Sequence, residues 1–305
     1  MSVSSTINLS ARANIIGSSW MIGAMAAFAV EDGFIKAASA QLPVGQVLIL
    51  FGLGGACLFA IGILWRGETL FSKDVVSPTM RLRMFFEIIG RLFYVLALIS
   101  TSLSSTTAIL QATPLVVVLG AAVLFGEKVG WRRWLAIGLG LIGVLIILRP
   151  TAESFSISSL LAVIGMLGFA GRDLASRAAP LSLSAFVLGL YGFLAVVFAG
   201  IVFSLWQGQA FVWPAMHGAL YMVGAVLFGT VAYVSLMKAM RTGEVSSVTP
   251  FRYTRLLFGI GLGLSVFGET LDVPMMVGSS VIVLSGLFIL RRSTRIKETS
   301  AGAPV

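Results

Sequence analysis

Charged side chains are scarce in this chain. Asp, Glu, Lys and Arg together make up 11% of its 305 residues, whereas a soluble domain carries about a quarter. The single cysteine, Cys57, excludes a disulfide bond within the chain, and the single histidine, His217, excludes a metal site built from several histidines. We find no phosphate-binding glycine loop, no zinc-protease motif and no nucleophile paired with a base. The sequence therefore points away from a soluble protein, from an enzyme and from a protein with a metal or another cofactor.

Apolar residues take the place of the missing charges and recur in long blocks. They make up 58% of the chain, and the mean hydropathy is +1.01. A helix of about 20 apolar residues is long enough to cross the hydrocarbon core of a bilayer. We therefore predict an all-α membrane protein embedded in the lipid bilayer, with ten transmembrane helices. The predicted spans are about 15–37, 44–65, 82–101, 104–125, 131–149, 156–178, 183–206, 215–239, 245–267 and 273–291.

Lys and Arg residues are distributed unevenly between the connections. If the N-terminus lies in the cytoplasm, one residue, Arg149, falls in the opposite loops, whereas the cytoplasmic segments hold 14 of the 21, namely Arg12, Arg66, Lys73, Arg81, Arg83, Lys128, Arg132, Arg133, Lys238, Arg241, Arg291, Arg292, Arg295 and Lys297. Cytoplasmic loops of membrane proteins are rich in Lys and Arg. We therefore predict a multi-pass protein of the bacterial cytoplasmic (inner) membrane with both termini in the cytoplasm. The net charge of +9 then needs no nucleic-acid partner.

The two halves of the chain resemble each other. Glu127 follows span four and Glu269 follows span nine, 142 residues later, while Asp32 in span one recurs as Asp173 in span six, 141 residues later. Because each half has five spans, the second copy must be inverted in the membrane. In transporters, such inverted repeats place the substrate site near the midplane, between the repeats. The predicted units are a first repeat at 1–150, a second repeat at 151–291 and a cytoplasmic tail at 292–305.

Two motifs carry a resemblance to a known family. The first half has Gln111-Ala112-Thr113-Pro114 ahead of the charged segment 124–134, and the second half has Pro250-Phe251-Arg252-Tyr253 ahead of Phe267-Gly268-Glu269. With these motifs, the chain resembles the ten-helix EamA branch of the drug/metabolite transporter superfamily over nearly its whole length. The resemblance implies two inverted five-helix repeats around a central cavity, peripheral spans five and ten, and a carrier that works by alternating access. Many members carry an arginine in span two, but this chain has uncharged residues at 50–52.

Arginines inside span nine are the strongest candidates for a binding site. Arg252 and Arg255 lie three residues apart and therefore share one face of a helix, with Tyr253 beside them. An arginine at membrane depth costs at least about 3 kcal/mol unless it meets a counter-charge, water or a ligand. We therefore predict that this face looks into a cavity and binds a substrate. The other residues that we expect to bind the substrate are Glu87, Arg91 and Tyr94 in span three and Gln111 in span four.

Charged residues four apart on one helix predict ion pairs inside three spans. The predicted pairs are Asp32–Lys36 in span one, Glu87–Arg91 in span three and Asp173–Arg177 in span six, with Arg172 beside the last. The first and third pairs occupy matching positions in the two repeats, so they could form a gate at each end of the cavity or simply neutralise each other. We expect Glu31 to face away from the Asp32–Lys36 pair and to lie nearer water.

The charges inside the spans also indicate the class of substrate. The cations are Lys36, Arg91, Arg172, Arg177, Arg252 and Arg255, and the acids are Glu31, Asp32, Glu87 and Asp173, which leaves a charge of +2. Surplus guanidinium groups favour a carboxylate or a phosphate. We predict a secondary transporter for a small organic anion or zwitterion, such as an amino-acid-, nucleobase- or vitamin-like metabolite. The alternatives are a broad-specificity exporter of amphipathic compounds and a non-transporting scaffold. Glycine-rich spans five and ten could be packing helices or the interface of a homodimer.

Overall fold

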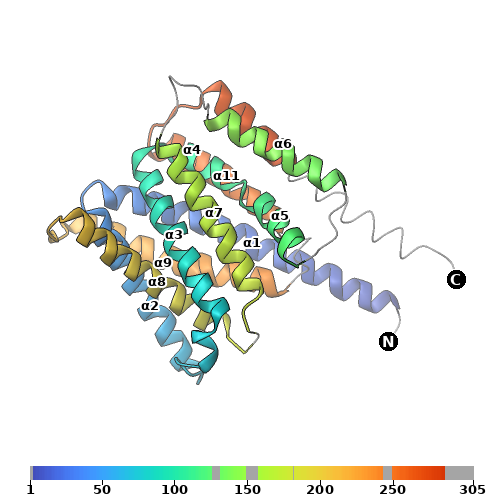
Figure 1. The fold of residues 1–305 in the computed structure, drawn as a ribbon, viewed down its shortest axis with the longest axis horizontal. Coiled ribbons are helices and arrows are strands. Elements are labelled where there is room, and N and C mark those ends of the chain that lie inside the picture. Colours follow the sequence, from blue (N-terminus) through green and yellow to red (C-terminus); the bar gives the residue numbers. More distant parts are fainter. Residues whose placement is uncertain (1–2, 126–130, 149–156, 181, 243–248, 286–305) are drawn as a thin grey trace.

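The computed structural model describes residues 3–125, 131–148, 157–180, 182–242 and 249–285, which form helices joined by turns (Figure 1). The first half contains α1 (Val3–Ser39), α2 (Val44–Trp65), the 3-10 helix η1 (Lys73–Val76), α3 (Pro78–Ser100), α4 (Leu103–Leu110), α5 (Thr113–Phe125) and α6 (Trp131–Leu148). The second half contains α7 (Ile157–Arg177), α8 (Ala185–Gln207), α9 (Met216–Thr242), η2 (Thr249–Tyr253), α11 (Thr254–Val266) and a last helix at Val273–Ser285. The all-helical fold predicted from the sequence is confirmed.

Four of the described helices are long and apolar enough to cross a membrane by themselves. They are Val44–Trp65, Ile157–Ser176, Ala185–Gln207 and Met216–Ala239. Two of the other predicted spans are broken into shorter pieces. Span four consists of α4 and α5, and span nine consists of η2 and α11. Pro114 lies in the first turn of α5 and Pro250 lies within η2, and each lacks the backbone N–H that a continuous helix would use.

Serine side chains set where three helices begin. Ser77, Ser102 and Ser184 each accept a hydrogen bond from the backbone N–H three residues later, at the starts of α3, α4 and α8. This cap satisfies an N–H group that has no partner within the helix. Pro78 follows as the first residue of α3, a position that proline favours. The helix therefore starts four residues before the predicted span, and Arg83 lies inside it.

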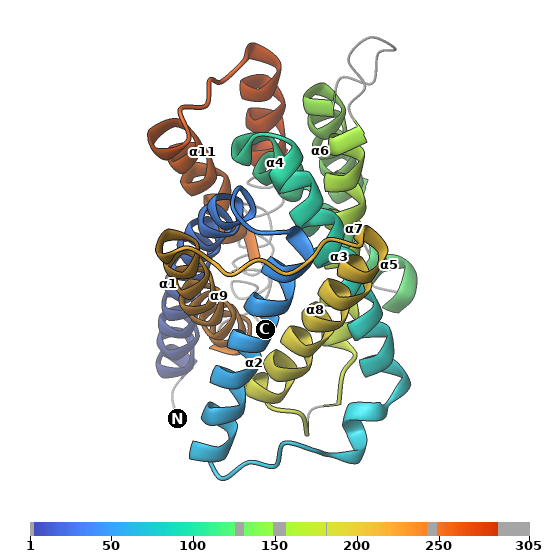
Figure 2. The same cartoon turned by 90° about the vertical axis from the view of Figure 1, so that its left-hand side faces the viewer.

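The helices of the two halves are interleaved. The closest pairs are α1 with α9, α2 with α8 and α3 with α7, and each joins one helix of the first half to one of the second. If the two halves exchange places, the α1–α9 pair becomes the α3–α7 pair, while α2–α8 maps onto itself. An inverted repeat with a pseudo-two-fold axis produces this pattern. Figure 2 shows α2 and α8 side by side, with α1 and α9 along one flank of the bundle.

The helices of spans five and ten lie together at the periphery of the molecule. Figure 1 shows α6 at the edge of the bundle, with the last helix beside it. The two backbones approach closely because both carry glycine at the crossing point. A Cβ atom added to Gly143 would lie 2.8 Å from the carbonyl oxygen of Gly278. These glycines therefore act as packing residues within one chain.

Candidate functional site

A cavity lies among the interleaved helices, with about 830 Å³ of space that protein atoms do not fill, part of it open to solvent. Both halves of the chain contribute to its wall, which combines charged side chains with aromatic rings. The charged residues are Glu31, Glu87, Arg91, Arg172, Asp173, Arg252 and Arg255. The aromatic residues are Phe28, Phe51, Phe169, Phe193 and Tyr233.

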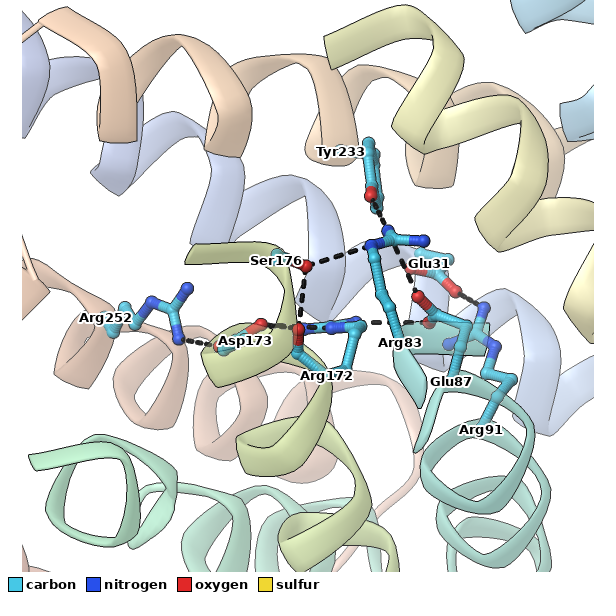
Figure 3. A network of polar contacts seen from close by, with 9 residues as sticks. All are labelled: Glu31, Arg83, Glu87, Arg91, Arg172, Asp173, Ser176, Tyr233 and Arg252. Carbon is cyan, nitrogen blue, oxygen red and sulfur yellow. Dashed lines mark hydrogen bonds and ion pairs between the residues drawn. The ribbon is translucent and has the colours of Figure 1, made fainter. Parts of the chain in front are cut away.

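A chain of ion pairs crosses one side of this cavity (Figure 3). Asp173 on α7 accepts a hydrogen bond of 2.6 Å from Nη1 of Arg252 and one of 2.8 Å from Nη2 of Arg172. The Nη1 of Arg172 lies 3.2 Å from Oε1 of Glu87 on α3. The Oε2 of Glu87 lies 3.5 Å from Nη2 of Arg83, one turn earlier on the same helix. The chain therefore connects η2, α7 and α3 through alternating charges.

Arg83 is fully buried, although the sequence placed it among the cytoplasmic segments. Its Nε donates a hydrogen bond of 2.9 Å to Oγ of Ser176, and its Nη2 donates to the hydroxyl of Tyr233 on α9. The sequence counted Arg83 with the cytoplasmic residues at the edge of span 82–101, whereas α3 begins at Pro78 and places Arg83 in its second turn.

A second ion pair joins α1 to α3. Arg91 donates through Nη2 to Oε1 of Glu31, and its guanidinium lies 4.3 Å from the ring centroid of Phe51. Glu31 is only 1% exposed, so the expectation that it lies nearer water was wrong. The predicted Glu87–Arg91 pair was wrong as well. Glu87 is instead held by Arg83 and Arg172 from two sides, and Arg91 turns toward the neighbouring helix.

A third ion pair joins the two halves directly. Nη2 of Arg255 on α11 lies 2.5 Å from Oδ2 of Asp32 on α1, and the same oxygen accepts a hydrogen bond of 2.8 Å from the hydroxyl of Tyr94. The predicted Asp32–Lys36 pair was therefore wrong. The Nζ of Lys36 instead lies 3.4 Å from Oε1 of Glu269, in the turn after α11, and donates a hydrogen bond of 2.7 Å to the carbonyl of Thr101.

Glu269 fastens the beginning of α4 to α11 and α1. Its carboxylate accepts hydrogen bonds from the backbone N–H of Leu103 at 2.6 Å and of Ser104 at 3.1 Å, and from Oγ of Ser104 at 2.7 Å. Gly268, with φ of 60°, turns the chain so that Glu269 points back at α4. Although burial raises its pKa, the bonds from Ser104 and Leu103 and the charge of Lys36 lower the pKa of Glu269 below its ordinary value. We call this set of contacts the Glu269 clasp.

Comparison with known proteins decides the family. The model of the EamA-like transporter family matches residues 15–149 and again residues 156–291. The chain belongs to the EamA-like transporter family. Its fold resembles a crystal structure that is 18% identical in sequence, with a TM-score of 0.63 over 94% of this chain and 99% of the other.

Three curated relatives of this EamA-like transporter have names that state a cargo. A riboflavin transporter of Vibrio cholerae serotype O1 is 28% identical over 92% of this chain and 94% of its own length. An S-adenosylmethionine uptake transporter of Rickettsia conorii is 22% identical over 90% and 92% of the two chains. A pseudopaline exporter of Pseudomonas aeruginosa is 25% identical over 87% and 92%. The family and these relatives point to a transporter of small molecules and not to an enzyme.

The structure brings most of the predicted site residues of this transporter to one cavity. The residues that line it are Glu87, Arg91, Gln111, Arg172, Asp173, Arg252 and Arg255. Tyr94 and Tyr253 are buried in the hydrophobic core instead and do not line it. Asp32 and Lys36 hold neighbouring helices together, and the side chain of Arg177 lies outside the described residues, as does its predicted pair with Asp173. The roles of all these residues in binding or gating remain predictions.

Sequence reasoning missed four residues of the site. Glu31 and Tyr233 line the cavity, Arg83 supports its wall, and Glu269 forms the clasp. Glu31 was recognisable as a carboxylate inside an apolar span, but its direction depended on knowing that α3 lies beside α1. Arg83 fell inside the predicted span 82–101, but its place near the end of that span led to its being counted with the cytoplasmic residues. Glu269 was visible in the sequence, but its role was not, because its partners in α4 lie about 165 residues away in the chain.

The charges described around the cavity leave a small positive excess. The arginines are Arg83, Arg91, Arg172, Arg252 and Arg255, whereas the carboxylates are Glu31, Asp32, Glu87 and Asp173. Five guanidinium groups therefore face four carboxylates. The excess is one charge instead of the predicted two, because Lys36 pairs with Glu269, Arg83 joins the set and Arg177 is outside the described side chains.

Proposed function

We propose that this EamA-like transporter carries a small organic anion or zwitterion with an aromatic part across the inner membrane by alternating access. The substrate is an amino-acid-, nucleobase- or vitamin-like metabolite, and it binds in the central cavity. The residues that contact it are Arg91, Gln111, Arg252 and Arg255, and aromatic rings hold its flat part.

The observation that carries this proposal is the pairing of guanidinium groups with aromatic rings along the cavity wall. The carbon Cζ of Arg91 lies 4.3 Å from the ring centroid of Phe51, and that of Arg255 lies 5.0 Å from the ring centroid of Phe28. A planar guanidinium can stack on an aromatic ring and still donate hydrogen bonds from its edge. The wall therefore offers flat faces and hydrogen-bond donors together, which suits a ring that carries acceptor groups. The excess positive charge favours a negative group on the same molecule.

The names of two relatives agree with the aromatic part of the proposed cargo but not with its negative charge, because riboflavin is uncharged and S-adenosylmethionine carries a net positive charge. Riboflavin and S-adenosylmethionine are both small molecules with a flat nitrogen heterocycle and several polar groups. For this chain, they are candidate substrates to be tested first. Because one relative is named an uptake transporter and another an exporter, the direction of transport has to be measured for this protein.

The orientation predicted from the charges assigns the two ends of the cavity. If both termini lie in the cytoplasm, the Glu269 clasp lies at the periplasmic end of the bundle, where α1 and α3 end and α4 begins. The clasp joins the first repeat to the second through Lys36 and Ser104. We propose that it keeps the periplasmic end closed, and that the contacts of Arg172, Asp173 and Arg252 rearrange when the other end closes.

Transport by the purified protein in liposomes tests the proposal. We expect labelled riboflavin, S-adenosylmethionine or an aromatic amino acid to accumulate in vesicles that contain the protein, and not in empty vesicles. Arg252→Ala and Arg91→Ala should each lower the transport of the accepted compound by about tenfold or more, because each removes a charged hydrogen-bond donor from the cavity. Arg66→Ala is the matched control, since Arg66 is exposed at the end of α2 and lies outside the cavity.

Three results would contradict this function. Unchanged transport in both cavity variants would show that the arginines do not bind the substrate. Transport of many unrelated amphipathic compounds, with tolerance of both substitutions, would favour a broad-specificity exporter. No flux of any compound from a metabolite pool would favour a scaffold.

A homodimer through spans five and ten remains a separate prediction. The outward face of α6 is apolar and exposed at Leu135, Leu139, Ile142 and Leu145. A lipid-facing helix would show the same face. Native mass spectrometry of the protein released from detergent distinguishes a monomer from a dimer, and loss of a dimer on substitution of Leu139 by Lys would locate the interface.

A further inference from the structure

One oxygen of Glu31 has no hydrogen-bond partner, although the residue is buried in the wall of the cavity. Its Oε1 accepts a hydrogen bond from Arg91, whereas its Oε2 is buried and unpaired. The Nε of Arg91 is also buried without a partner. An acceptor and a donor therefore lie unused on two residues that are joined to each other. Buried polar groups in proteins are nearly always hydrogen-bonded, and leaving one unpaired destabilises the fold.

The surroundings of Glu31 favour a flat ligand. The ring of Phe51 stacks on Arg91, and its centroid is 5.0 Å from that of Phe193, which in turn is 6.2 Å from Tyr233. All three rings line the cavity. On the side of α9, a Cβ atom on Gly229 would lie 2.8 Å from the Phe51 ring and 3.4 Å from Cδ of Glu31. Glycine at this position therefore lets the backbone of α9 lie close against the ring and the carboxylate.

The charge balance decides between two kinds of donor. A ligand for Glu31 must offer a hydrogen, either from an ammonium group or from a neutral N–H. Five described guanidinium groups surround the cavity against four carboxylates, so another cation beside Arg91 would be repelled. A neutral ring N–H carries no charge and avoids this cost. The neighbouring Nε of Arg91 is an unpaired donor, so the ligand should also carry an acceptor next to that N–H, such as a ring carbonyl.

We propose that Glu31 is a substrate-binding residue that recognises the N–H of a flat heteroaromatic ring. The free Oε2 accepts a hydrogen bond from the ring N–H, Nε of Arg91 donates to an adjacent ring carbonyl, and the ring stacks along Phe51 and Phe193. This assignment rests on the proposed function, because it names which part of the cargo enters the wall between α1 and α3. It narrows the substrate class to compounds with an N–H next to a carbonyl in an aromatic ring.

A pair of probes that differ by one methyl group tests the assignment. Riboflavin has a ring N–H between two carbonyls, and in 3-methylriboflavin a methyl group replaces that hydrogen. Binding of each to the purified full-length protein is measured by quenching of flavin fluorescence. We expect wild-type protein to bind riboflavin roughly ten- to a hundredfold more tightly than 3-methylriboflavin, the range expected for one hydrogen bond to a charged group.

Substitution of Glu31 should abolish this discrimination. In Glu31→Gln, Arg91 needs the amide oxygen, so the NH₂ group faces the ring N–H and two donors meet. The ratio of the two dissociation constants should therefore fall to about one. Glu31→Asp keeps the charge for Arg91 but withdraws the free oxygen by one methylene, and it should lower the ratio as well. Thermal unfolding of each variant shows whether it is folded. If Glu31→Gln does not fold, Glu31→Asp alone tests the role of Glu31.

Asp173→Asn is the matched control in the same cavity. Both oxygens of Asp173 already accept hydrogen bonds from guanidinium groups, Oδ1 from Arg172 at 2.8 Å and Oδ2 from Arg252 at 2.6 Å. This variant should change the binding of both probes to the same extent, so that the ratio stays at the wild-type value. The ratio of the two dissociation constants is less sensitive to a general loss of protein stability than the affinity for either probe alone.

The outcomes separate this inference from the proposed function. Failure of the wild-type protein to bind riboflavin, equal binding of both probes, or an unchanged ratio in both Glu31 variants would each overturn the role of Glu31. If the protein transports another compound and the rate does not depend on Glu31, the proposed transport function stands and the role of Glu31 is overturned. Binding with the expected ratio but no flux in liposomes would support Glu31 and overturn the proposed transport.

Discussion

The Glu269 clasp offers the most direct test of how the two halves are held together. Glu269→Ala would leave the N–H groups of Leu103 and Ser104 unpaired at the start of α4, and it would remove the counter-charge of Lys36. Loss of a helix cap costs about 0.5–2 kcal/mol, and a partly exposed ion pair adds roughly 0–1 kcal/mol. We therefore expect a loss of about 2 kcal/mol in the free energy of unfolding.

The effect of pH on the clasp has a definite sign. Because the pKa of Glu269 is lowered from its ordinary value of 4.5 in the folded protein, its contribution to stability is present at neutral pH. That contribution is lost as the pH falls through the lowered pKa. The charged group that faces Glu269 among the described residues is Lys36. The difference in stability between wild type and Glu269→Ala should therefore be largest at neutral pH and should narrow as the pH falls from 4.5 through the lowered pKa.

Thermal unfolding in detergent, followed by circular dichroism, measures both effects. At pH 7 we expect the variant to melt roughly 5 °C below wild type, from about 2–4 °C per kcal/mol for a chain of this size. Lys36→Met should cost less than half as much, since the three hydrogen bonds to α4 remain. Ser265→Ala is the control, because Ser265 is exposed and bonds only to its own helix. Equal melting of Glu269→Ala and wild type at pH 7 would refute the reasoning.

Three further substitutions test packing and buried hydrogen bonds. Gly143→Val should lower the melting temperature by several degrees in the same assay, because even a Cβ atom would lie 2.8 Å from the carbonyl of Gly278. Tyr233→Phe should cost about 1–3 kcal/mol, measured by chemical denaturation, because it removes a partner of buried Arg83; an unchanged midpoint would contradict that bond. Gln46→Ala should speed proteolysis of the loop between α8 and α9, because the Gln46 amide holds Val212 in that loop. Its Nε2 donates to the carbonyl of Val212 at 2.7 Å, and its Oε1 accepts from the N–H of Val212 at 2.9 Å. Cleavage at the wild-type rate would contradict this role of Gln46.

The sequence was sufficient to predict the helices, the repeat and the residues that gather at the cavity. Hydropathy identified the spans because a helix in a bilayer needs a long apolar stretch. The cost of a buried arginine identified Arg91, Arg252 and Arg255 as cavity residues. These conclusions depend on local properties of the chain, which sequence reasoning can assess.

The partners of the charged residues could not be predicted in the same way. Spacing of four residues favoured Asp32–Lys36, but such a pair on one helix contributes only about 0.2–0.5 kcal/mol. Asp32 meets Arg255 from another helix, with Tyr94 bonded to the same oxygen. Tertiary contacts of this kind outweigh the helical pair, and they depend on which helices are neighbours. Only the fold supplies that information.

The pairing of Asp32 with Arg255 has a consequence for biogenesis. The two residues are 223 positions apart, so α1 leaves the ribosome long before its partner has been translated. Until the ninth span is made, the Asp32 carboxylate of the first half therefore lacks its arginine and has the hydroxyl of Tyr94 as a partner. Final closure of the bundle is then tied to the arrival of the ninth span, which makes late truncations of this gene more damaging than their length alone would suggest.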